Sequence, residues 1–83
     1  MQVLQRLQWT GLPVDLGELF ILKKDEWRAI CKLTSHADGW ELRLYVNSPE
    51  NTVASRVCVV EEHVFTTADG WKKKMIRRGW TTR

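Results

Sequence analysis

Residues 27–46, with the sequence WRAICKLTSHADGWELRLYV, decide the fold because apolar and polar side chains alternate in both halves. Alternation on both sides of Asp38-Gly39 predicts an antiparallel hairpin, since Asp and Gly tolerate the positive φ of a tight turn. A turn centred on Asp38-Gly39 pairs Leu33 with Leu44, and it places all the apolar positions on one face. These positions are Trp27, Ala29, Cys31, Leu33, Trp40, Leu42, Leu44 and Val46.

The length and composition predict one small soluble domain. A chain of 83 residues buries roughly 60–65% of its unfolded surface. No apolar run approaches the ~18 residues of a membrane span, and the first residues lack the continuous apolar stretch of a signal peptide. Because the chain has only two cysteines, a disulfide scaffold is not expected. We therefore expect a cytoplasmic protein without membrane contact.

The segment before the hairpin is less regular. We expect residues 1–16 to form an N-terminal arm or edge segment. This segment could contain a short helix or a strand, and Gly11-Leu12-Pro13 would end either one. Residues 18–24, ELFILKK, predict a first strand. Phe20 and Leu22 face the core if Lys24-Asp25 forms a two-residue turn, whereas Leu19 and Ile21 do so if the loop has three residues.

A further strand follows the hairpin. Residues 47–51, NSPEN, form a dense turn cluster in which proline fixes φ and removes a donor. Residues 52–59 then predict a fourth strand. If Asn47 pairs with Thr52, the residues facing the core are Val53, Ser55, Val57 and Val59.

After Val59 the apolar period changes to that of an α-helix. The apolar residues recur every three or four positions, with Gly79 as a natural C-cap and Trp80 folding back on the last turn. The echo of the Asp38-Gly39 turn at Asp69-Gly70 raises the alternative of a second hairpin, which the poor alternation of residues 71–76 disfavours. The helical stripe consists of Val60, Val64, Ala68, Trp71 and Met75, widened by Phe65 and Ile76.

Together these segments predict an α+β fold, a four-stranded antiparallel sheet with one face covered by a C-terminal α-helix (ββββα). The domain would span residues 17–80 and be followed by a basic tail at 81–83. The strand GWELRLYVN, the strand SRVC and the helix end RRGW resemble small uncharacterised bacterial proteins of ββββα pattern. The resemblance implies the fold and no activity.

No catalytic or metal site is expected. Cys31-x4-His36 and Cys58-x4-His63 hold the ligand types of zinc, but five residues along a strand span roughly 16 Å and end on opposite faces. The predicted registers turn Cys31 inward and Cys58 outward, which also argues against a disulfide. Cys58 with Glu62 would supply a nucleophile and a base without an oxyanion donor or cleft. We therefore predict neither an enzyme nor a cofactor.

The sheet face opposite the helix is the predicted binding surface. Its candidate residues are Arg28, Lys32, Arg43, Tyr45 and Arg56, helped by Lys72–Lys74. The predicted registers place Arg43 beside Arg56 and Lys32 beside Tyr45. A basic cluster around a tyrosine could bind an anion or single-stranded nucleic acid. The alternative is an ordinary solvated face relieved by Glu18, Glu26 and Glu41.

Self-association is the second functional expectation. One helix covers one face of the sheet, and edge strands are templates for pairing with another copy. The sequence therefore predicts a non-enzymatic binding domain that forms a homodimer. The alternative is a nucleic-acid- or anion-binding module that uses the basic outer face.

Overall fold

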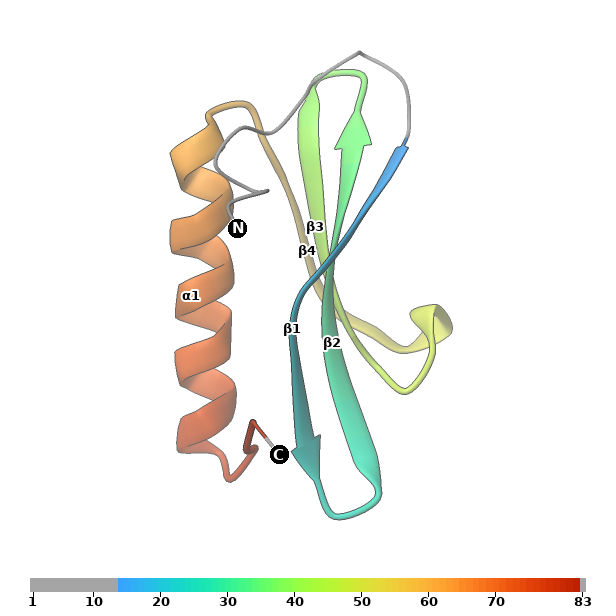
Figure 1. Ribbon diagram of the computed structural model, residues 1–83, viewed down its shortest axis with the longest axis vertical. Helices are drawn as coiled ribbons and strands as arrows, with labels where there is room; N and C mark the ends of the chain where they lie inside the picture. Colours follow the sequence, from blue (N-terminus) through green and yellow to red (C-terminus); the bar gives the residue numbers. More distant parts are fainter. Residues whose placement is uncertain (1–13, 83) are drawn as a thin grey trace.

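The computed structural model describes residues 14–82, which form a four-stranded antiparallel sheet with one helix along one face (Figure 1). The predicted ββββα architecture is confirmed. The strand order is β1-β2-β3-β4, so β1 and β4 are the edges. The possible helix or strand within residues 1–13 lies outside the described residues. The elements are β1 (Val14–Lys24), β2 (Trp27–His36), β3 (Gly39–Val46), the 3₁₀ turn η2 (Pro49–Asn51), β4 (Thr52–Cys58) and α1 (Glu61–Arg77).

The central hairpin of β2 and β3 has the predicted faces and a different turn. Leu33 pairs with Leu42, two residues from the predicted partner, and His36 pairs with Gly39 across the loop Ala37-Asp38. A shift of two residues preserves the faces because side chains alternate with period two. Gly39 has φ +144° and lies where a Cβ would overlap the carbonyl of Cys58. The approach of β4 therefore requires glycine at the end of the turn.

The first hairpin turns at Asp25-Glu26, where Asp25 has φ +56°. Leu22 pairs with Ala29 and is fully buried, so the first of the two predicted alternatives, with Phe20 and Leu22 inward, holds, although the two-residue turn is Asp25-Glu26 rather than Lys24-Asp25. β1 is longer than predicted, since it begins at Val14 and contains two irregularities. Trp27, predicted for the core, is 53% exposed. Trp27 is exposed because it lies at the tip of the β1–β2 hairpin, and this tip extends beyond the end of α1 (Figure 1).

The predicted register of β4 is wrong by one residue. Cys58 pairs with Trp40 and Arg56 with Leu42, and the pairing shifts at a bulge near Val53. One inserted residue reverses the faces of the strand beyond it. Cys58 is consequently buried, whereas Val57, predicted for the core, is 44% exposed on the opposite face.

The helix contributes its predicted stripe to the core. Val64, Ala68 and Met75 are buried, whereas Val60 at the N-cap and the two residues predicted to widen the stripe, Phe65 and Ile76, are exposed. Among the described residues, no helix combines the length and apolar character needed to cross a membrane. The buried core consists of Leu22, Ala29, Cys31, Leu33, Trp40, Leu42, Leu44, Cys58, Val64, Ala68 and Met75.

The chain after α1 returns to the first strand. The N–H of Gly79 donates to the Ile76 carbonyl and that of Trp80 to the Met75 carbonyl, as in a Schellman cap. Trp80 packs against the core, in agreement with the prediction that it folds back on the last turn of the helix. Thr81 then exchanges two backbone hydrogen bonds of 2.7 and 2.8 Å with Lys23. The predicted tail thus begins with a bridge to β1.

Candidate functional site

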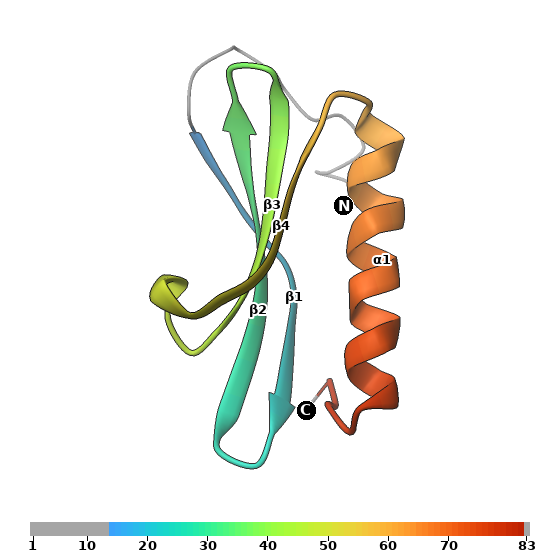
Figure 2. The same ribbon diagram turned by 180° about the vertical axis from the view of Figure 1, so that it is seen from behind.

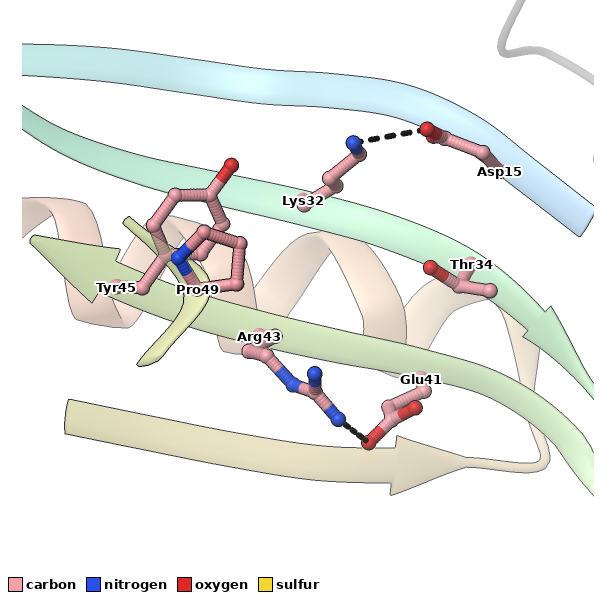
Figure 3. A pocket seen from close by; sticks show the side chains of 7 residues that line it. All are labelled: Asp15, Lys32, Thr34, Glu41, Arg43, Tyr45 and Pro49. Atoms are coloured by element: carbon pink, nitrogen blue, oxygen red, sulfur yellow. Dashed lines mark hydrogen bonds and ion pairs between the residues drawn. The ribbon is translucent and has the colours of Figure 1, made fainter. Parts of the chain in front are cut away.

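The sheet face away from α1 carries a pocket of about 290 Å³. Figures 1 and 2 show that the β3–β4 connection, with η2, projects on this side of the sheet. Tyr45 forms one wall and is only 6% exposed, and Ile30, its cross-strand partner, is 8% exposed. Pro49 brings η2 to the same wall. The lining residues, drawn in Figure 3, are Asp15, Lys32, Thr34, Glu41, Arg43, Tyr45 and Pro49.

Two cations lie side by side in this pocket. Lys32 and Arg43 are direct partners on β2 and β3, and like charges in this position repel. Each is relieved by a separate carboxylate. Lys32 Nζ lies 2.8 Å from Asp15 Oδ2, and Arg43 Nη2 lies 3.1 Å from Glu41 Oε2 (Figure 3). The pocket therefore holds two positive and two negative groups, with the cations adjacent.

The Asp15–Lys32 pair shifts the titration of both groups. The hydrogen bond from Lys32 lowers the pKa of Asp15, helped by the backbone N–H of Gly17, which donates to Asp15 Oδ1 at 2.8 Å. The same contact with Asp15 raises the pKa of Lys32. Both groups are thus held in their charged forms.

The structure brings together three of the five predicted site residues. Lys32, Arg43 and Tyr45 line the pocket. Arg28 lies on the same face beyond it, where it pairs with Lys23 of β1. Arg56 does not belong to this surface, because the shifted register turns it toward α1, where its Nη1 donates to Thr67 Oγ1 at 3.4 Å.

The charge distribution of the outer face differs from the prediction. Arg43 lies opposite Ser55 rather than Arg56, so the repulsion predicted between those two arginines is absent. Residues 72–74 belong to α1 on the other side of the sheet, and they do not extend this surface. The outer face is thus a charge-balanced pocket rather than a basic stripe.

The sequence pattern does not reveal Asp15 and Pro49 as parts of the site. Asp15 falls within the predicted arm, because the apolar run that signals β1 starts later in the sequence. Pro49 has the pattern of a turn residue and nothing more. The sequence signal that could locate Asp15 is the pair Asp15-x-Gly17, in which the Gly17 N–H donates to Asp15 Oδ1 at an irregularity inside the strand.

The two cysteines are buried free thiols. Cys58 faces the core, contrary to the predicted outward position, because the β4 register differs. Burial raises the pKa of Cys31 to about 12. Glu62 is exposed on α1. Within residues 14–82, no three His, Cys, Asp or Glu side chains are grouped closely enough to hold a metal ion.

The two sheet edges differ. β1 contains two irregularities, carries Lys23 and Lys24, and is bridged by Thr81 at one end. β4 has one bulge and a single charged residue, Arg56, and no described segment pairs with its outer edge. Charges, bulges and covering segments are the usual means by which proteins block edge pairing. β4 lacks most of them.

These features define a small α+β protein with an open sheet edge and a charge-balanced pocket. No protein family matches the chain, and no curated protein or solved structure shows significant similarity to it. The resemblance to small bacterial ββββα proteins and the cytoplasmic location therefore stay predictions.

Proposed function

We propose that this protein is a non-enzymatic binding domain that self-associates through β4. The observation that supports the proposal is the open, valine-rich edge. Val53 is 61% exposed, Val57 is 44% exposed, and Val59, just after the strand, is 70% exposed. Such an edge combines unpaired backbone groups with apolar side chains, and both gain from pairing with another strand.

A second copy of the chain is the partner that this edge fits. Two-fold pairing of β4 with itself continues the sheet across the dimer and satisfies the backbone groups of both edges. The only charged side chain on the strand is Arg56. Registers that place Arg56 directly opposite its copy are disfavoured by repulsion, so the pairing is offset from that residue.

Analytical ultracentrifugation tests this proposal over micromolar to submillimolar concentrations. We expect the average mass to rise from that of the monomer toward twice that value. Val57→Lys places a charge on the edge and should keep the protein monomeric. Ile76→Lys is the matched control, because Ile76 on α1 is 45% exposed and lies away from β4. A monomer at every concentration, or equal effects of the two variants, would contradict the proposal.

A second candidate function is the binding of a small organic anion in the outer-face pocket. The supporting observation is the pair Lys32 and Arg43, whose charges are adjacent beside the aromatic wall of Tyr45. A carboxylate could accept hydrogen bonds from both cations while a flat apolar body contacts Tyr45 and Pro49. A nucleic acid strand fits this pocket less well, because Asp15 and Glu41 already neutralise the two cations.

Titration with benzoate, followed by amide chemical shifts, tests this second candidate. We expect shifts at Lys32, Arg43 and Tyr45 that saturate, and smaller shifts with benzyl alcohol, which lacks the charge. Lys32→Gln with Arg43→Gln should abolish the shifts, whereas Arg28→Gln, on the same face outside the pocket, should retain them. Equal responses to benzoate and benzyl alcohol would reject an anion site.

A further inference from the structure

Six cationic residues from two distant parts of the sequence lie at one end of the molecule. The tip of the β1–β2 hairpin and the C-terminal end of α1 lie at the same end in both views (Figures 1 and 2). Two contacts join them, since Lys24 Nζ donates to the Arg78 carbonyl at 2.8 Å and Lys23 bridges to Thr81. We call this group the basic end. It comprises Lys23, Lys24, Arg28, Lys74, Arg77 and Arg78, all of them exposed.

The basic end carries most of the positive charge of the described chain. Its six cations are accompanied by only Asp25 and Glu26, which gives a net charge of +4. The rest of residues 14–82 contains five Lys or Arg against eight Asp or Glu, a net charge of −3. The ion pairs of Lys32, Arg43 and Lys73 lie elsewhere. Asp25 and Glu26 therefore balance only part of the positive charge of the basic end.

Helix stability explains only part of this cluster. Cations in the last turn of a helix interact favourably with its negative end, which accounts for Lys74 and Arg77. It does not account for Lys23 and Arg28, which are cross-strand partners of like charge at the hairpin tip. Like charges in that arrangement cost stability. A polyanionic partner would relieve that cost.

An exposed aromatic ring adjoins these cations. Trp27 is 53% exposed, and it is the one exposed tryptophan among residues 14–82. It pairs directly with Lys24, so the two side chains share a face of the hairpin. The hydrogen bond from Lys24 to Arg78 joins this face of the hairpin tip to the end of α1. Exposed aromatic rings next to cations are the means by which proteins bind unpaired bases together with their phosphates.

We propose that the basic end binds single-stranded nucleic acid. Trp27 stacks on one base, and Lys74, Arg77 and Arg78 at the end of α1 contact the neighbouring phosphates, while Lys23 and Arg28 lie on the opposite face of the hairpin. Stacking requires an unpaired base, so a single strand is favoured over a duplex. The proposal concerns a surface separate from β4 and from the outer-face pocket, and it does not depend on self-association.

Fluorescence anisotropy with a fluorescein-labelled oligothymidylate of about ten nucleotides tests this proposal. We expect binding at low salt that weakens roughly 20- to 50-fold between about 50 and about 200 mM salt, as three or four phosphate contacts would give. Trp27→Ala should weaken binding about fivefold or more, and Trp27→Phe should restore most of the loss. Arg77→Gln with Arg78→Gln should lower the logarithmic salt dependence by about 1.4.

The controls separate this surface from others. Arg56→Gln removes an exposed cation that lies outside both the basic end and the outer-face pocket, and it should leave binding unchanged. Circular dichroism should show the same fold for every variant, since the substituted residues of the basic end are exposed. Three results would overturn the proposal: no binding at low salt, equal binding of a duplex of the same length, or unchanged binding after Trp27→Ala. Binding to phosphatidylserine vesicles but not to the oligonucleotide would also overturn it.

Discussion

The carbonyl group of Cys58 occupies the space where a side chain at position 39 would begin. Gly39 closes the β2–β3 hairpin, and Cys58 ends β4 beside it. This contact fixes how β4 approaches the hairpin, and through it the faces of Cys58 and Val57. The proposed self-association through β4 depends on that arrangement.

Gly39→Ala should destabilise the protein by at least about 2 kcal/mol. The new methyl group would overlap backbone rather than a flexible side chain, and φ at this position is +144°. Overpacking and positive φ each cost about 1–3 kcal/mol. Urea unfolding followed by tryptophan fluorescence measures the change. A loss below about 0.5 kcal/mol, the size of an ordinary surface effect, would show that β4 does not approach Gly39 this closely.

Gly70 in the middle of α1 and Gly79 just after it should respond in opposite directions to alanine. Gly70 lies inside α1 with open space where the methyl group of alanine would lie, so Gly70→Ala should stabilise by about 0.5–1 kcal/mol. Gly79 has φ +100° in the helix cap, so Gly79→Ala should destabilise by about 1 kcal/mol. Thermal unfolding of the two variants compares them directly. Effects of the same sign would contradict the described cap.

Hydrophobic alternation was sufficient to predict the architecture and most of the core. It predicted the inward faces of Leu33, Leu42 and Leu44 even though the turn lies elsewhere, because a shift of two residues leaves faces unchanged. It could not predict the face of Val57, since the bulge near Val53 reverses the pattern by one residue. Bulges depend on packing between strands, and the residues adjacent in sequence carry little information about them.

The candidate site was predictable only in part for the same reason. Lys32, Arg43 and Tyr45 belong to the hairpin, whose faces were correct, and they remain together. Arg56 was lost with the register of β4. The basic end was not predicted as one surface, although Arg28 and Lys74 belong to the predicted nucleic-acid alternative, because it joins a hairpin tip to the end of a helix 54 residues away in sequence.

The Asp15–Lys32 pair should make stability sensitive to acid. The pKa of Asp15 is lowered in the folded protein from 3.8, so its contribution is present above that value and is lost as pH falls through the folded pKa. Between about pH 5 and about pH 2, the free energy of unfolding should therefore fall less in the Asp15→Asn variant than in the unmodified protein. Urea unfolding at several pH values measures the difference. Identical pH profiles for the two proteins would contradict the pair.

Cys31 should resist alkylation in the folded protein. Burial raises its pKa from 9.0 to about 12, so the reactive thiolate is suppressed in the folded state and available in the unfolded state. Stability from this group is complete below pH 9.0 and is lost as pH rises toward 12. Iodoacetamide labelling with mass spectrometry should modify Cys31 only at the rate of unfolding. Rapid labelling under native conditions would place it outside the core.

The concentration dependence of amide hydrogen exchange in β4 tests the central claim most directly. If β4 pairs with a second copy, its exchange should slow as the protein concentration rises, while that of β1 should stay constant. The Val57→Lys variant should remove this dependence, and Ile76→Lys should preserve it. Fast exchange along the outer edge of β4 at every concentration would contradict self-association through this strand.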